Sequence, residues 1–355
     1  MNALEVGWFA PLCDDDALHL GIPDPERAAS FEHCSEIVLE AERQGFDTVL
    51  LPSGYELGID NTTFAAGIAI ATSKIRLLLA VRTGELWPPQ LARQLASIDE
   101  MAHGRLDVNI ISSPLPGETL DGPARYERAS EVMTMLDHLL RGQPSTPTGP
   151  TYAIDTDAPR VAREHRRRPP FYFGGLSEPA RALAASQADV YLMWPDTLEQ
   201  TKEIVDDLRG RAQERGRDLK VGYRVHVIVR PSMAEAREAA RELVSQLEPE
   251  AGAALRSRAL DAGSVGVGRQ GSLRDLADEE GYVDDVLFTE IGRARSGCGA
   301  AVVGDPRTVI DYFETLAGLG IDALILSGYP HLEECRRVGE LVLPGLAHGP
   351  LSLAP

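Results

Sequence analysis

The chain has 355 residues, 43% of them apolar, and a formal net charge of −19. So negative a surface argues against nucleic acid and anionic membrane faces as partners, because their phosphates would be repelled. The first residues lack the basic start and apolar core of a signal peptide, and no apolar run is long enough to span a bilayer. Four scattered cysteines without a Cys-x-x-Cys pair are typical of reduced thiols and suggest no metal site, so we expect a cytoplasmic protein.

Short apolar runs alternate with stretches of helical periodicity along the chain. Runs typical of strands buried on both faces occupy residues 6–10, 46–51, 75–81, 106–111, 171–173, 188–194, 221–229 and 323–326. Helices are predicted at residues 26–44, 89–102, 128–140, 178–187, 234–247 and 307–319, with another beginning at 332. Eight strands in alternation with helices predict an α/β fold, a (β/α)8 TIM barrel with insertions that forms a single domain over residues 1–355.

One supersecondary unit recurs, in which a helix precedes an aspartate and an apolar strand follows it. Residues 45–55 and 320–329 are the two clearest copies, and residues 188–194 are a weaker third. A barrel of repeated units would produce such copies, but a doubly wound sheet would also contain them. The repeat therefore supports an α/β fold more firmly than it supports a barrel.

Two connections are longer than the others. Residues 141–170 are irregular and carry five arginines from Arg160 to Arg168, which we interpret as a solvated loop or a subunit contact. The segment 248–299 is a Gly-rich insertion in which Arg293 and Arg295 lie between glycines. Such a segment can be a lid that closes over an anionic substrate and excludes water, or a surface loop with spare arginines.

Polar side chains follow the ends of the first and last strands. Asp14, Asp15 and Asp16 make the loop after the first strand acidic, and Tyr329 and His331 come just past the last strand. Chemistry in a barrel takes place at the C-terminal ends of the strands, and Tyr329 and His331 can both move or donate protons. The alternative is a turn in which the tyrosine packs and the histidine is solvated.

The longest predicted strand carries polar residues on one face. Valines point to one side of residues 221–229, while Arg224 and His226 point to the other. In a barrel the valines would pack on the outer helices, so Arg224 and His226 would face the interior. A buried arginine without a partner is costly, and we therefore expect either a bound anion or an internal acidic side chain beside Arg224.

The sequence Gly174-Gly175-Leu176-Ser177 joins a predicted strand to a predicted helix. Glycines let the backbone approach a ligand, the start of a helix offers free N–H groups, and the serine adds a hydroxyl donor. Together these features suit a phosphate. A helix cap explains Ser177 nearly as well, so both interpretations stay open.

Over nearly its whole length the chain resembles the bacterial luciferase-like, flavin-dependent monooxygenases, and most of all their alkanesulfonate monooxygenase branch. The resemblance is sharpest at Tyr172-Phe173-Gly174-Gly175, at residues 224–230, at residues 300–305 and at Leu326-Ser327-Gly328-Tyr329-Pro330-His331-Leu332-Glu333-Glu334. It implies a TIM barrel that uses reduced FMN, supplied by a separate NAD(P)H-dependent flavin reductase, and molecular oxygen. The substrate implied is a small anionic organosulfonate, whose C–S bond breaks to give an aldehyde and sulfite. A homo-oligomer, a dimer or a tetramer, is also implied.

The resemblance carries over to individual positions. Residues that match the active site of the branch are Arg224, His226, Arg295, Tyr329, His331 and Trp194. Positions that match the flavin-binding residues are Asn109, Ser112, Gly175, Leu176 and Ser177. The two arginines would bind the sulfonate, Tyr329 and His226 would transfer protons, and His331 would assist them.

Departures from the branch border the substrate pocket. The loop 53–60 has no cysteine and contains Tyr55 and Glu56 instead, and the loop 114–125 is shorter. These differences argue against a simple alkanesulfonate, since a tyrosine and a glutamate can recognise a polar or bulky substrate. The alternatives are oxygenation of a sulfone or a natural-product intermediate, a deazaflavin-dependent dehydrogenase, and a flavin-binding protein without catalysis.

Overall fold

The computed structural model describes residues 3–258, 260 and 263–353. Eight parallel strands follow one another around a barrel, and pairing of the last strand with both the first and the seventh closes it. These strands are β1 (Glu5–Phe9), β2 (Thr48–Leu51), β3 (Arg76–Arg82), β4 (Leu106–Ile111), β5 (Phe171–Phe173), β6 (Val190–Met193), β7 (Lys220–Val229) and β10 (Ala323–Ser327). The predicted TIM barrel is therefore confirmed, with all eight strands at the expected places.

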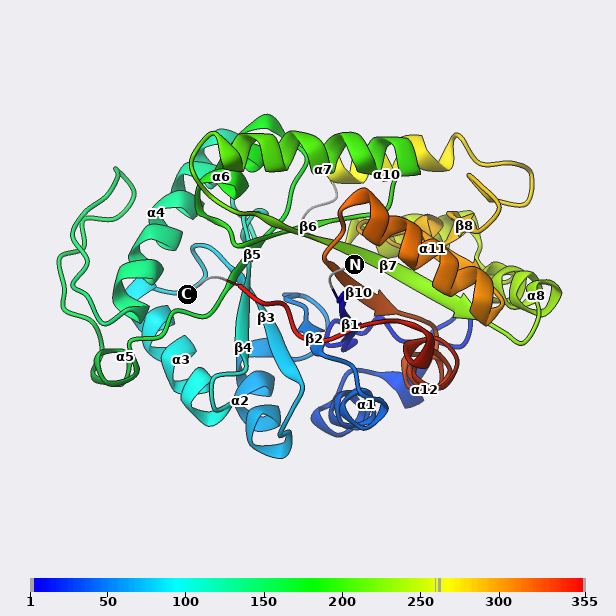
Figure 1. The fold of residues 1–355 in the computed structure, drawn as a ribbon, viewed down its shortest axis with the longest axis horizontal. Coiled ribbons are helices and arrows are strands. Elements are labelled where there is room, and N and C mark those ends of the chain that lie inside the picture. Colours follow the sequence, from blue (N-terminus) through cyan, green and yellow to red (C-terminus); the bar gives the residue numbers. More distant parts are fainter. Residues whose placement is uncertain (1–2, 259, 261–262, 354–355) are drawn as a thin grey trace.

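Helices surround the barrel, as Figure 1 shows. They are α1 (Phe31–Gln44), α2 (Asn61–Ala71), α3 (Pro88–Met101), α4 (Gly122–Leu140), α5 (Arg160–His165), α6 (Glu178–Gln187), α7 (Leu198–Gln213), α8 (Met233–Val244), α9 (Pro249–Ser257), α10 (Val265–Arg274), α11 (Pro306–Leu319) and α12 (His331–Leu341). Short 3-10 turns occupy Pro25–Arg27, Glu290–Arg293 and Leu343–Gly345. None of the helices in the described ranges is long and apolar enough to cross a membrane.

The helices differ from the prediction at several places. Helix α5 lies within the segment 141–170, which was expected to be irregular, and α9 and α10 lie in the insertion, where no helix was expected. The segment 26–44 is a 3-10 turn followed by α1, because the Ser30 side chain caps α1 by accepting a hydrogen bond from the His33 N–H. The sequence analysis did not identify α2, which is apolar on all sides and so lacks helical periodicity. Helix α7 was not predicted either, because most of its residues are polar and only a narrow face, which includes Ile204, Val205 and Leu208, is buried.

Side-chain alternation along the strands separates two apolar layers. Val225, Val227 and Val229 of β7 belong to the large core between the barrel and its helices. Phe9, Leu50, Leu78, Tyr172, Val190 and Ile325 form a smaller cluster inside the barrel. Arg224 and His226 lie on this interior face of β7, as the period-2 pattern predicts.

The insertion 248–299 adds structure beyond the eight strands. Its β8 (Leu287–Phe288) pairs antiparallel with β9 (Ala301–Gly304). Strand β9 in turn pairs parallel with the C-terminal half of β7. Helices α9 and α10 and the 3-10 turn at Glu290–Arg293 make up most of its remainder. In Figure 1 β8 and α8 lie at the right, near the end of β7. The insertion therefore lies at the C-terminal mouth of the barrel.

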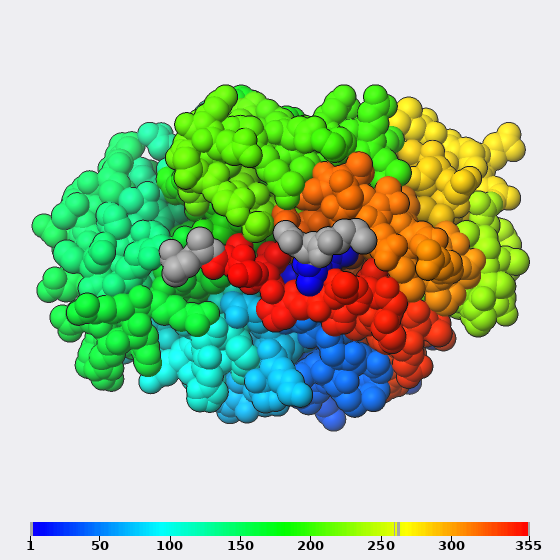
Figure 2. Space-filling model, in the orientation of Figure 1, coloured from blue at the N-terminus to red at the C-terminus, as the bar shows by residue number. Residues whose placement is uncertain are grey.

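The C-terminal segment lies across the opposite end of the barrel. Leu4 bridges to His348, and the Leu351 N–H donates to Glu5 Oε2 at 3.0 Å. Leu351 and Leu353 pack against the interior cluster. This segment, red in Figures 1 and 2, crosses the face from which both views are drawn.

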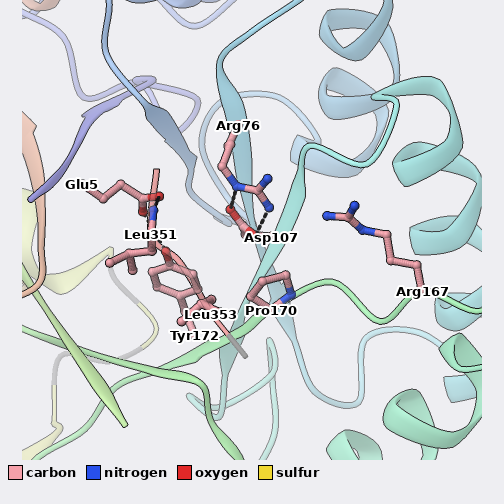
Figure 3. A pocket seen from close by; sticks show the side chains of 8 residues that line it. All are labelled: Glu5, Arg76, Asp107, Arg167, Pro170, Tyr172, Leu351 and Leu353. Atoms are coloured by element: carbon pink, nitrogen blue, oxygen red, sulfur yellow. Dashed lines mark hydrogen bonds and ion pairs between the residues drawn. The ribbon is translucent and has the colours of Figure 1, made fainter. Parts of the chain in front are cut away.

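A polar network surrounds a cavity of about 150 Å³ beside this segment. Figure 3 shows Glu5, Tyr172 and Leu351 on one side and the Arg76–Asp107 ion pair on the other, with Arg167 extending toward the pair. The Tyr172 hydroxyl donates to Glu5 Oε1 at 2.8 Å. Burial, together with the charge of Asp107, raises the pKa of Glu5 to about 7. We call the C-terminal segment and this network the floor of the barrel.

The basic group at residues 160–168 is only partly a solvated loop. Arg168 is largely buried, lies over the ring of Phe171 and forms ion pairs with Asp137 and Asp189. Arg160 is exposed and pairs with Glu164. The solvated-loop interpretation was therefore wrong for Arg168, because distant acids that its sequence neighbourhood does not contain neutralise it.

Candidate functional site

Five of the predicted residues come together at the C-terminal mouth. Arg224 and His226 come from β7, Arg295 from the insertion, and Tyr329 and His331 from the junction between β10 and α12. The rings of His226 and Tyr329 stack with centroids 5.2 Å apart, and the His331 ring meets Tyr329 edge-on at 5.3 Å. Burial lowers the pKa of His226, and the charges of Arg224, Arg295 and His331 lower it further. We call this group the mouth cluster.

Arg224 is a buried cation that no carboxylate of the described residues contacts. It is 3% exposed, its Cζ lies 4.5 Å from the centre of the Phe9 ring, and its Nη1 donates to the Val225 carbonyl at 3.1 Å. Its Nη2 atom is buried and lacks a hydrogen-bond partner among the described residues. Burial lowers the pKa of Arg224 from its ordinary value. The sequence predicted either an internal acidic side chain or a bound anion beside Arg224. Because no acidic side chain of the described residues contacts Arg224, the arrangement favours a bound anion.

His226 has both ring nitrogens engaged by the protein. The Ser327 hydroxyl lies 2.6 Å from Nδ1, and Nε2 lies 3.2 Å from the carbonyl oxygen of Cys298. A carbonyl can only accept, so Nε2 carries the proton and Nδ1 accepts from Ser327. Burial, reinforced by the charge of Arg224, lowers the pKa of His226 well below its ordinary value. His226 is therefore a neutral ring held in one tautomer.

Tyr329 and His331 have free polar atoms. The Tyr329 hydroxyl and both ring nitrogens of His331 are buried and find no partner within the described part of the chain. His331 is held through its backbone N–H, which donates to Asp16 at 2.9 Å, and its ring stacks on Phe9 at 5.6 Å. Burial raises the pKa of Tyr329 and lowers that of His331, so both side chains are neutral near pH 7.

Arg295 links the insertion to the loop after β1. Its guanidinium forms an ion pair with Asp15, whose other carboxylate oxygen, Oδ1, is buried and unpartnered among the described residues. Neighbouring Asp14 holds the same loop, since its carboxylate accepts from the N–H groups of Ala29 at 2.6 Å and Gly58 at 3.0 Å. A contact between residues 280 positions apart thus closes one side of the mouth cluster.

Trp194 lies just past β6, against the insertion. A Cβ atom added at Gly266 would lie 3.0 Å from the Trp194 ring, and one added at Gly297 would lie 3.2 Å from it. Trp194 therefore supports the insertion closely, and only glycine fits these two approaches without displacement. It makes no ring contact with the five residues of the mouth cluster among the contacts within the described residues.

The residues predicted to bind the flavin lie on neighbouring strands. Asn109 on β4 pairs in register with Tyr172 on β5, and Ser112 follows the end of β4. At the start of α6 the Ser177 hydroxyl accepts from the Ala180 N–H at 3.4 Å, which confirms the cap interpretation. The same hydroxyl donates to the Tyr126 hydroxyl at 3.0 Å, and Gly175 has φ +140°. The cap does not exclude a phosphate, so that role stays a prediction.

The sequence analysis missed several residues that shape the mouth. Phe9 lies beneath Arg224 and His331, Ser327 and Cys298 hold His226, and Tyr126 contacts Ser177. Only Asp15 had a sequence signal, the acidic loop after the first strand. Tyr55 and Glu56, which were expected to recognise the substrate, have exposed side chains, and that role stays a prediction.

The family follows from a sequence comparison. The profile of the family described as luciferase-like monooxygenase matches residues 4–323. The chain belongs to the luciferase-like monooxygenases. The resemblance inferred from the motifs is therefore confirmed, and so is the expectation of an enzyme rather than a binding protein without catalysis.

Two curated relatives agree with this membership, and a solved structure shares the fold. This chain is 50% identical over 356 residues to the sulfoquinovose monooxygenase of Novosphingobium aromaticivorans, with 98% of each chain covered. It is 46% identical over 346 residues to the sulfoquinovose monooxygenase of Agrobacterium fabrum, covering 97% of this chain and 90% of the other. Among solved structures, riboflavin lyase with modified FMN and riboflavin superposes with a TM-score of 0.79 at 17% identity, over 99% of this chain and 94% of the other.

Proposed function

We propose that the protein uses a reduced flavin and molecular oxygen to cleave the C–S bond of the sugar sulfonate sulfoquinovose. The reaction would release sulfite and leave an aldehyde at the carbon that carried the sulfur, while the second oxygen atom is reduced to water with electrons from the flavin. The two relatives named for this substrate support the proposal, since both are at least 46% identical over almost the whole chain. The observation that carries it is the buried Arg224 with an unpartnered Nη2 atom.

The residues present fit a flavin mononucleotide. Leu176 and Ser177 precede the first turn of α6, whose N–H groups suit a phosphate, and Tyr126 and Ser177 add two hydroxyls there. A Cβ atom added at Gly175 would lie 2.8 Å from the Ala180 Cβ, so only glycine keeps this turn open. Asn109 and Ser112 would contact the rest of the cofactor. When bound and reduced, the flavin supplies the electrons that activate oxygen.

The source of the reduced flavin is proposed to be a separate NAD(P)H-dependent reductase. The sequence contains no convincing dinucleotide-binding fingerprint of its own, which supports delivery from outside. A cytoplasmic location, where such reductases and reduced thiols occur together, is proposed as well. All four cysteines are free, in keeping with that location.

Arg224 and Arg295 would bind the sulfonate. A sulfonate has three acceptor oxygens and one negative charge, and guanidinium groups match it well. The Nη2 atom of Arg224 has no competing acceptor, whereas Arg295 already pairs with Asp15. We therefore expect Arg224 to make the shorter contact with the anion, and Arg295 to close the mouth as part of a lid formed by residues 248–299.

Tyr329 and His331 are the better candidates for proton transfer. Proton transfer needs an atom that can reach the substrate, and the nitrogens of His226 are occupied by Ser327 and Cys298. The Tyr329 hydroxyl and the His331 nitrogens are free. We therefore propose that His226 positions Tyr329 by stacking, in place of the direct role first expected for it.

A homodimer is proposed through α2. This helix has no charged residue in its eleven positions, and its outward Ile70 is 73% exposed. The exposed ring of Phe31 packs beside it, 5.5 Å from the Phe64 ring. An apolar helix face of this kind is more stable when a second copy covers it.

The function is tested by measuring sulfite. Purified protein is mixed with a flavin reductase, NADH, FMN, oxygen and sulfoquinovose, and released sulfite is quantified. We expect catalytic release by the wild-type protein and a loss of about 100-fold or more in the Arg224→Met variant, because methionine keeps the volume but removes the anion contact. The same mixture without the enzyme, to which a known amount of sulfite is added, corrects for sulfite oxidation by peroxide from free flavin.

Two other outcomes would contradict the proposal. Oxygen consumption coupled to product formation, with no sulfite from any organosulfonate in a broad panel, would indicate another oxygenation such as that of a sulfone. Anaerobic hydride transfer to a deazaflavin would indicate a dehydrogenase on the same barrel.

A further inference from the structure

A buried carboxylate oxygen that can only accept lies beside the mouth cluster. Three side chains there are at least nine-tenths buried and carry unpartnered polar atoms, namely Arg224, Tyr329 and His331. A carboxylate oxygen, Asp15 Oδ1, is also buried and lacks a partner within the described residues. The charge of Asp15 affects the pKa values of Arg224, Tyr329 and His331, although burial is the larger influence on each. Asp15 pairs with Arg295, and the carboxylate of the next residue, Asp16, accepts from the His331 N–H at 2.9 Å, so Asp15 lies beside the mouth cluster. We call Asp15 and the mouth cluster together the chamber.

The geometry of Asp15 selects for a neutral donor. Its Oδ2 atom is engaged by Arg295, which already compensates the charge of the carboxylate. A second cation would meet the positive charges of Arg295 and Arg224 and be repelled. A hydroxyl group instead satisfies Oδ1 without adding charge.

An apolar ligand beside Asp15 would be disfavoured. A buried carboxylate oxygen that loses its contact with water must gain a hydrogen bond, or the complex is weakened. A site built around such an acceptor rejects an analogue that lacks the donor much more strongly than an apolar pocket rejects an extra group. The chamber therefore suits a ligand that carries both an anion, for Arg224, and a hydroxyl group, for Asp15 Oδ1.

We propose that Asp15 Oδ1 accepts a hydrogen bond from a sugar hydroxyl of the substrate and so determines the preference for a sugar sulfonate over an alkanesulfonate. This inference rests on the proposed function, because it assigns the sulfonate to Arg224. The ion pair with Arg295 orients the carboxylate, so that the lid segment and the loop after β1 together present the acceptor.

The test compares two sulfonates with the same number of carbons. Binding of sulfoquinovose and of hexane-1-sulfonate is measured through quenching of tryptophan fluorescence, and sulfite release is measured for both. In Asp15→Asn the remaining amide oxygen would accept from Arg295, which leaves an NH2 donor at the position of Oδ1. We therefore expect sulfoquinovose binding and kcat/KM to weaken by about 10- to 100-fold, the range for a lost hydrogen bond to a charged group. Loss of the charge that pairs with Arg295 affects both sulfonates, but hexane-1-sulfonate has no hydroxyl to donate, so its kcat/KM should fall less and the ratio between the two substrates should change by about 10-fold or more.

Two control variants separate other causes. Arg295→Lys keeps the cation beside Asp15 and should lower activity on both sulfonates to the same extent, because the acceptor oxygen remains. Asp14→Asn, in the same loop, should leave the ratio between the two substrates unchanged, since the Asp14 carboxylate faces Ala29 and Gly58 rather than the chamber.

The possible outcomes separate a failure of the role proposed for Asp15 from a failure of the proposed function. Equal losses on both sulfonates in Asp15→Asn, or no loss on either, would overturn the inference while wild-type sulfite release upheld the function. Wild-type protein that releases sulfite from hexane-1-sulfonate but not from sulfoquinovose would also overturn the inference. Sulfite release from neither compound would overturn the proposed function itself.

Discussion

The two histidines of the mouth cluster differ in what their ring nitrogens contact. His226 is fixed between a hydroxyl donor and a carbonyl acceptor, and its ring lies against Tyr329. His331 is held by its backbone and by ring contacts with Trp8 and Phe9, which leave both nitrogens free. Two histidines from neighbouring strands, one on β7 and one just past β10, therefore differ in the chemistry they can perform.

This difference predicts different pH profiles for two matched variants. Burial lowers the pKa of His331, so the neutral base persists below its ordinary titration range and activity falls only at more acidic pH. His331→Gln should remove that acidic limb from the kcat profile and reduce kcat by about 100-fold. His226→Gln should keep the limb, because it acts by displacing Tyr329. An acidic limb that disappears with His226→Gln and persists with His331→Gln would contradict this assignment.

At the scale of elements, the C-terminal segment and β1 form the floor. Glu5 of β1 accepts hydrogen bonds from Tyr172 and from the Leu351 backbone, and Asp107 lies close enough for its charge to act on Glu5. Phe9, at the other end of β1, contacts Arg224 and His331. One short strand therefore joins the network that closes the barrel to the cluster at its mouth.

The floor should make stability depend on pH through Glu5. Its pKa is raised from 4.5 to about 7, so between these values the folded state holds a proton that the unfolded state has released. The free energy of unfolding therefore falls as pH rises through this window, by about 3 kcal/mol from this group. Glu5→Gln should remove this contribution. Chemical denaturation of both proteins at pH 4 and at pH 8 measures the free energy of unfolding, which should fall more from pH 4 to pH 8 in the wild type than in the variant. Parallel curves for the two proteins would contradict the assignment.

For the whole molecule, exposed apolar residues bear on association. Phe31 of α1 and Ile70 of α2 are exposed on two helices that contact each other, and Leu276 is exposed on the connection after α10. Net charge of −19 keeps copies of the chain apart, so association needs a defined apolar face. The face of α2 meets that requirement.

Substitution on α2 should change the molecular mass in solution. We expect the wild type to have about twice the single-chain mass of 38.4 kDa, and Ile70→Glu to have the single-chain mass, because a buried carboxylate is costly at an apolar interface. Leu276→Glu, which also places a charge at an exposed leucine, should leave the mass unchanged. Light scattering after size exclusion measures all three, and a wild-type mass of one chain would contradict the dimer.

Much of the fold could be predicted because its signals are local. The period-2 alternation in β7 places Arg224 and His226 on one face wherever that strand packs, and Gly45 ends α1 with φ +92° because a left-handed residue is needed there. Pro330 is a second local signal, because it stands immediately before His331, the first residue of α12. Such patterns depend on a few neighbouring residues, so the sequence alone determined the strands, most helices and the polar face of the barrel.

Other features depended on residues far apart in the chain. The ion pair of Asp15 with Arg295, the contact of Ser327 with His226 and the placement of Leu351 beneath Glu5 each join distant segments. No local pattern specifies which hydrogen-bonding atoms such contacts consume and which they leave free. Only the tertiary structure decided which polar atoms are hydrogen-bonded, because these contacts depend on atoms brought together by closure of the barrel. Both ring nitrogens of His226 are bonded, whereas the ring nitrogens of His331 and the Oδ1 atom of Asp15 have no partner among the described residues.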